Sequence, residues 1–163
     1  MLALLPLLLV LAAEPKEPAP KKAEGKLESQ TPRRPHPLAP SLPELSDAEE
    51  KKLDAAIDRF IDADIGKSKG AEAKQAMEDF KNLGPESFFA LVRGLNKSAS
   101  IDHSCPAVTI ARKLTGIIRA SDDRELVQFA RENVGAGVKR SPHMVVLDQV
   151  KSAARSRLNS LGR

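Results

Sequence analysis

The sequence predicts an all-α fold of about six helices arranged as stacked helical hairpins. Apolar residues recur at helical spacing through most of the chain after Ser46, and proline or glycine corners separate the successive runs. One apolar pattern returns after 38 residues, where Phe88, Phe89, Leu91, Val92 and Arg93 recur as Leu126, Val127, Phe129, Ala130 and Arg131. A helical period near forty residues is typical of stacked α-repeats, which bury one face and present another to partners.

The first three helices are marked by their terminal residues. Ser46 and Glu49 form a capping-box pattern, so the first helix should begin there and end at Gly66. A second helix is expected over 71–83 and a third over 85–96, because a Gly-Pro pair stops one and starts the next. The short corner predicts that the second and third helices pack as a close antiparallel pair.

The last three helices follow similar rules. Pro106 should start the fourth helix, Ser121 or Asp122 should cap the fifth, and the glycine-containing run 135–137 should end it. The sixth helix should begin at Ser141-Pro142. The repeat offset predicts that helices two and three form one unit and helices four and five another, with helices one and six as covers.

A resemblance to a known class rests on one corner. The run Leu83-Gly84-Pro85-Glu86, followed by an apolar helix ending in Leu-Val-Arg-Gly-Leu, resembles the turn and second helix of HEAT and armadillo-like repeats. The likeness covers about 71–134, and the runs 102–106 and 135–138 are similar to uncharacterised exported bacterial proteins of that type. It implies a short right-handed α-α superhelix with a protein-binding or scaffolding role, and it carries no assigned activity.

The N-terminus is expected to direct export to the periplasm, cell envelope or extracellular space. Residues 1–13 join an almost wholly aliphatic run, Leu2–Leu11, to small residues of the kind that signal peptidase accepts. The run is too short to span a bilayer, which takes about 20 apolar residues. Two alternatives stay open: an uncleaved, membrane-associated segment, which would be the only membrane contact, and a cytosolic protein.

Residues 14–45 are expected to form a disordered spacer. This stretch mixes Lys and Glu, holds little apolar surface and is interrupted throughout by proline. Such a segment cannot bury enough surface to offset the entropy lost on ordering. The folded domain is therefore expected over 46–163.

No catalytic, cofactor or metal site is expected, and the favoured interpretation is a non-enzyme. Cys105 is the single cysteine, so an intramolecular disulfide is impossible. The side chains of His103, Cys105 and His143 are a weak pattern for zinc, and no nucleophile signature surrounds the thiol. We expect Cys105 at a helix start, packed as a small hydrophobic residue; a thiol- or metal-dependent enzyme is the third-ranked alternative.

Charge is unevenly distributed along the expected helical domain. Residues 46–100 hold nine basic and eleven acidic side chains, whereas 101–163 hold eleven basic and six acidic ones. The expected partner-binding face gathers the late cations Lys139, Arg140, Lys151, Arg155 and Arg157. This face favours a protein or acidic polymer as partner of a monomeric module. The alternative is a binder of nucleic acid or an anionic surface, which we rank lower because there is no aromatic stacking platform and an exported protein seldom meets chromosomal DNA.

Overall fold

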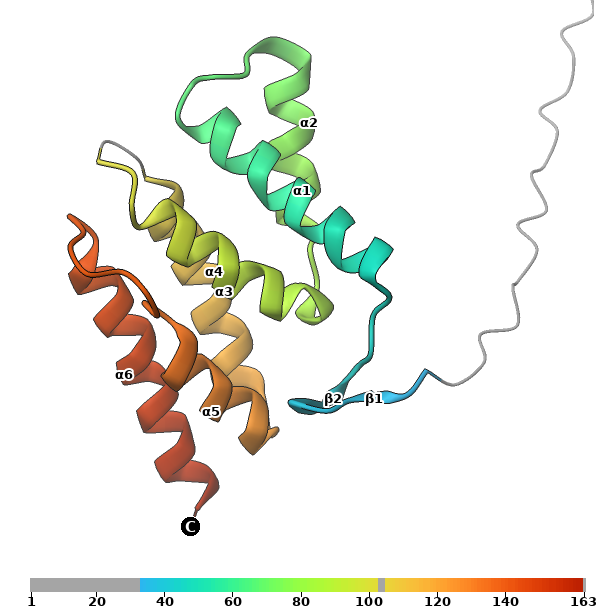
Figure 1. Ribbon diagram of the computed structural model, residues 1–163, viewed down its shortest axis with the longest axis vertical. Coiled ribbons are helices and arrows are strands. Elements are labelled where there is room, and N and C mark those ends of the chain that lie inside the picture. The colour runs from blue at the N-terminus through green and yellow to red at the C-terminus, as the bar shows by residue number, and fades with distance from the viewer. Residues whose placement is uncertain (1–32, 103–104, 163) are drawn as a thin grey trace, which may run out of the picture. The chain divides into compact units, whose positions relative to one another are not determined.

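Six α-helices dominate the computed structural model, which describes residues 33–102 and 105–162 (Figure 1). The predicted helical fold class is confirmed, since the described residues are mostly helical and hold little strand. The helices are α1 Asp47–Asp64, α2 Gly70–Lys81, α3 Phe88–Ser98, α4 Pro106–Ala120, α5 Arg124–Asn133 and α6 Met144–Leu161, with a 3-10 turn, η1, at Pro85–Ser87. The expected export segment, 1–13, and the spacer as far as residue 32 lie outside the described residues.

The start of α1 is the predicted capping box. The backbone N–H of Ser46 donates to Glu49 Oε2 at 2.9 Å, and the backbone N–H of Glu49 donates to Ser46 Oγ at 3.4 Å. Both amides would otherwise lack an intrahelical partner, so the pair fixes where the helix begins. The cap of α5 differs from the expectation: it is Asp123, one residue after the predicted Asp122.

A β-hairpin precedes the helices, which corrects the expectation that 14–45 is unstructured throughout. Strands β1, Pro35–His36, and β2, Ala39–Pro43, pair antiparallel. Within β2, Ala39 is fully buried and Leu42 is 8% exposed. Prolines are tolerated here because both strands of a two-stranded sheet are edge strands. Their outward-facing backbone positions have no neighbouring strand that needs an N–H donor. The hairpin is held by tertiary contacts with α3 and α5 that the local composition does not reveal.

The helices pack against different neighbours from those predicted. The principal partner of α2 is α1, since the Phe60 and Phe80 rings stack at 3.8 Å between centroids. Helix α3 packs against α1 and α4, and α6 packs against both α4 and α5. The predicted units, α2 with α3 and α4 with α5, are therefore wrong, and α6 is more than a cover. The residues 82–84 together with η1 turn the chain away from α2 before α3 begins (Figure 1).

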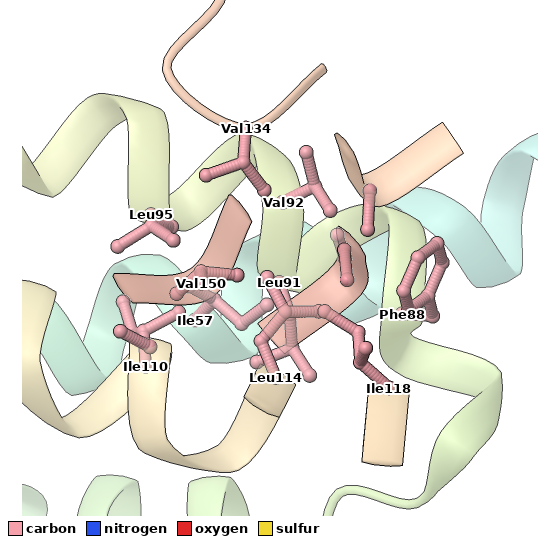
Figure 2. Close-up of a cluster of buried hydrophobic side chains, with 14 of the residues drawn as sticks. Ile57, Phe88, Leu91, Val92, Leu95, Ile110, Leu114, Ile118, Val134 and Val150 are labelled. Carbon is pink, nitrogen blue, oxygen red and sulfur yellow. The ribbon is translucent and has the colours of Figure 1, made fainter. Parts of the chain in front are cut away.

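One hydrophobic core, mostly of aliphatic side chains, joins all six helices. Figure 2 shows its centre, where side chains from α1, α3, α4 and α6 converge; the labelled ones from those helices are Ile57, Phe88, Leu91, Val92, Leu95, Ile110, Leu114, Ile118 and Val150. All of them are at most 3% exposed. The core is packed so closely where α1 crosses α3 that one position on α3 has to be glycine. A Cβ on Gly94 would lie 2.4 Å from Ile57 Cγ2, so only a hydrogen fits there.

The two copies of the repeated pattern occupy related places on α3 and α5. Phe88 and Leu126 are both buried, and the Phe89 and Phe129 rings meet edge to face at 4.9 Å between centroids. Asn96 of α3 also closes the end of α5, because its side-chain amide donates to the Asn133 carbonyl at 2.9 Å. The two copies therefore touch through non-equivalent positions, since Phe89 corresponds to Val127 and Phe129 corresponds to Leu91 in the repeated pattern.

Candidate interaction surface

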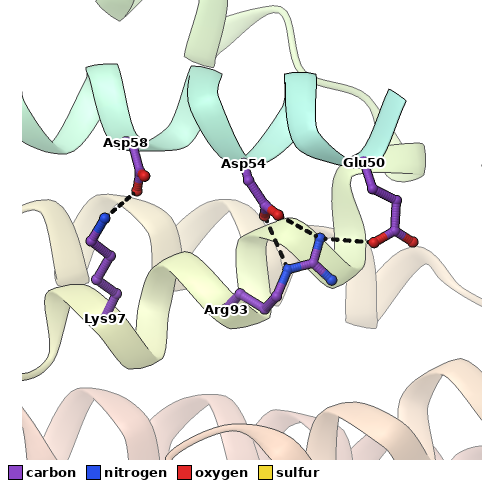
Figure 3. Close-up of polar contacts among 5 residues, drawn as sticks. All are labelled: Glu50, Asp54, Asp58, Arg93 and Lys97. Carbon is purple, nitrogen blue, oxygen red and sulfur yellow. Dashed lines mark hydrogen bonds and ion pairs between the residues drawn. The ribbon is translucent and has the colours of Figure 1, made fainter. Parts of the chain in front are cut away.

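The carboxylates of α1 are engaged by cations of α3 (Figure 3). Arg93 contacts Asp54 through two hydrogen bonds of 3.0 and 3.1 Å and lies 3.2 Å from Glu50. Lys97 donates to Asp58 at 2.7 Å. The negative charge of the N-terminal half is thus partly neutralised within the chain, which reduces its attraction for a basic partner.

The C-terminal half keeps an excess of cations. Residues 105–162 contain ten Lys or Arg side chains and five Asp or Glu side chains. Lys139 and Arg140 are exposed on the α5–α6 loop, Arg155 is exposed on α6, and Lys151 is half-buried beside Gly135. Within the described ranges, no ion pair involves any of these four cations. They form the basic edge, defined as Lys139, Arg140, Lys151 and Arg155.

Arg157 behaves differently from the other predicted cations. Its Nε donates to the Ser121 carbonyl at 2.8 Å, and its guanidinium pairs with Asp122. These contacts tie α6 to the turn between α4 and α5. Arg157 is therefore engaged in holding the fold, and the basic edge is left with the other four residues.

A groove between α4 and α6 was not anticipated from the sequence. It encloses about 610 Å³ and has a floor of small and aliphatic side chains, including Ala111, Val150 and Ala153. Arg112 and Arg119 stand exposed along its α4 side, and none of the lining residues is acidic. Among residues that the structure describes, neither arginine has an ion pair or a side-chain hydrogen bond. Their spacing of seven residues places both on one helix face, and this is the signal that could have revealed them.

Asp123 anchors the start of α5 to the hairpin. Its Oδ2 accepts from the Ser41 N–H at 2.8 Å, and its Oδ1 accepts from the Leu126 N–H at 3.0 Å. Burial alone would raise the pKa of this carboxyl, but the hydrogen bonds from Ser41 and Leu126 outweigh burial and hold the pKa below its ordinary value. One side chain thus caps α5 and fastens the hairpin to it.

The expected position of the thiol is partly corrected. Cys105 is the N-cap residue of α4, as predicted, but its side chain is exposed and does not pack as a small hydrophobic residue. His143 Nε2 lies 3.2 Å from the Ile101 carbonyl oxygen, and His103 lies outside the described residues. In the described part of the chain, no three His, Cys, Asp or Glu side chains gather as metal ligands.

Comparison with protein families, curated proteins and solved structures found no match to this chain. None of the six described helices combines the length and apolar character needed to cross a membrane. What the structure defines is a small helical protein with a charge-segregated surface and an open groove between α4 and α6.

Proposed function

We propose that this chain is an exported, non-catalytic, HEAT-like helical module that binds an acidic partner protein through its C-terminal half. The observation that supports it most is the contrast in charge pairing. Carboxylates of α1 are paired with Arg93 and Lys97, whereas most cations of α4, α6 and the loop before α6 have no described partner. An unpaired positive surface attracts acidic partners and speeds their encounter.

Two further observations favour a repeat-like, exported module. Equivalent positions of the repeated pattern are buried in both copies, as Phe88 and Val92 on α3 and Leu126 and Ala130 on α5 show, and stacked repeats would have this property. The leader-like composition of residues 1–13 supports export.

The proposal is tested by fluorescence anisotropy of a poly-glutamate peptide titrated with the full chain. The double variant Lys151→Glu and Arg155→Glu should weaken binding by about tenfold, because two attractive contacts become repulsive. The matched control is Lys51→Glu with Lys52→Glu, which changes net charge equally on exposed positions of α1. Equal losses in both variants would refute recognition by the C-terminal half, and no loss in either would refute a contribution of the basic edge to binding of poly-glutamate.

Nucleic acid is the second candidate, because the same unpaired cations would also neutralise phosphates. The chain has no Trp or Tyr, and Phe88 and Phe129 are packed within the fold, so a base-stacking platform is missing from the described surface. Duplex DNA is therefore the competing probe. Tighter binding of DNA than of poly-glutamate, with affinity falling steeply as salt rises, would replace the acidic protein with nucleic acid.

A further inference from the structure

We propose that the α4–α6 groove is the seat of an amphipathic α-helix from the partner, with two carboxylates seven residues apart that face Arg112 and Arg119. This inference rests on the proposed function for the acidic character of the partner. It adds the form of the partner and the place where it docks.

The first step is the shape of the groove. Its two walls are helix faces, and the lining residues recur at helical spacing on α4 and again on α6. The floor carries small side chains, such as those of Ala111 and Ala153, which let a third helix approach the backbones of α4 and α6 closely. A groove between two packed helices is the usual seat of an amphipathic helix.

The second step is the glycine at position 116. Gly116 lies inside α4, where glycine destabilises a helix relative to alanine. A Cβ built on it would meet nothing within 4 Å, so no contact within the described chain requires glycine there. Because Gly116 lines the groove, its missing side chain leaves room for the backbone of a docked helix.

The third step is the distribution of charged and apolar side chains along the groove. Arg112 and Arg119 are separated by about 10.5 Å along the axis of α4, which matches two positions seven residues apart on a second helix. Val108, which is 39% exposed, lines the groove. Val145, which is 67% exposed, precedes Gln149 and Ser152 by four and seven residues. It therefore lies on the same face of α6 as these two groove residues. A matching ligand helix therefore carries apolar residues opposite these valines and carboxylates opposite the arginines.

The groove fits such a partner better than the basic edge does. On α6, Asp148 precedes Lys151 and Arg155 by three and seven residues, so one carboxylate shares the stripe of these two cations. No carboxylate lines the groove. An acidic helix would thus meet two cations and no opposing charge between α4 and α6.

The test uses the full chain and a synthetic amphipathic helical peptide with two Glu residues seven positions apart; a peptide with Lys at both positions is the control. Isothermal titration should detect binding of the Glu peptide and little binding of the Lys peptide. Arg112→Glu with Arg119→Glu should weaken binding by about tenfold or more. Lys151→Glu with Arg155→Glu changes charge equally outside the groove and should have a much smaller effect.

A second variant separates groove blockage from loss of folding. Gly116→Leu places a side chain in the groove where the fold has open space, so it should abolish peptide binding while the melting temperature stays at or above that of the parent. Full binding by Gly116→Leu, or a larger loss from the edge variant than from the arginine variant, would overturn the groove assignment. Binding of poly-glutamate without binding of the Glu peptide would overturn the groove alone, whereas failure of both probes would overturn the proposed function as well.

Discussion

Gly94 and Gly116 both lie inside helices, yet their surroundings predict opposite effects of adding a methyl group. Gly94→Ala would force a Cβ against Ile57 and should cost about 1–3 kcal/mol of unfolding free energy through overpacking. Gly116→Ala meets open space and should add about 0.5–1 kcal/mol through helix propensity. Urea unfolding followed by circular dichroism measures both. Destabilisation by Gly116→Ala would show that this glycine has a role within the fold.

Asp123 is expected to stabilise the protein in a pH-dependent way. Its pKa is lower in the folded chain than in the unfolded one, so its contribution is present above the unfolded value of about 3.9 and is lost as pH falls through the folded value. Asp123→Ala should therefore cost about 1–2 kcal/mol at neutral pH, in the range of a lost N-cap.

That difference should shrink in acid, since the protonated carboxyl of the parent is a poorer acceptor for Ser41 and Leu126. Chemical unfolding of the parent and the variant at neutral pH and below pH 4 provides the comparison. A difference that stays constant with pH would contradict the assigned role of the Asp123 carboxylate.

At the level of helices, the α1–α3 ion pairs should contribute modestly. Arg93 and Asp54 make a two-pronged contact, but both side chains are more than a third exposed to solvent. A double-mutant cycle of Arg93→Ala and Asp54→Ala should give a coupling free energy of about 0.5–1 kcal/mol. The coupling should fall at high salt because exposed charges are screened. A coupling near zero at low salt would mean that packing alone orients α3 on α1.

Helix identity could be predicted from the sequence, whereas helix pairing could not. The capping box at Ser46 and the proline start at Pro106 act locally, so residue types alone locate those boundaries. Which helices pack together depends on the direction of the chain after η1. That direction is set by backbone geometry and by packing against distant elements. The prediction that α2 and α3 form a hairpin was wrong because it assumed that a short corner folds the chain straight back.

The β-hairpin and the groove were not predicted because both depend on elements that are distant in the sequence. The segment 35–43 has four prolines and few apolar side chains. It is ordered because distant elements bury Ala39 and Leu42 and because Asp123 accepts a hydrogen bond from Ser41. Arg112 and Arg119 are ordinary exposed cations until α6 is placed beside α4. In contrast, the basic edge could be found by counting charges, although counting did not reveal that Arg157 is engaged with Ser121.

Across the described unit, the two halves differ in surface charge and in shape. The N-terminal half pairs many of its carboxylates internally, and the hairpin and Asp123 fasten the chain before α1 to the start of α5. The C-terminal half leaves cations and a groove open to solvent. The surface between α4 and α6 is therefore both positive and hollow, and it is where we propose that the partner docks.

The most direct test of this account is an NMR titration of the full, isotopically labelled chain with the Glu-bearing helical peptide. We predict that backbone amide shifts concentrate on α4 and α6, around Arg112, Gly116 and Ala153, with α1 and α2 nearly unchanged. Shifts confined to α1 and α2, or no shifts at saturating peptide, would contradict the central claim that the C-terminal half is the binding surface.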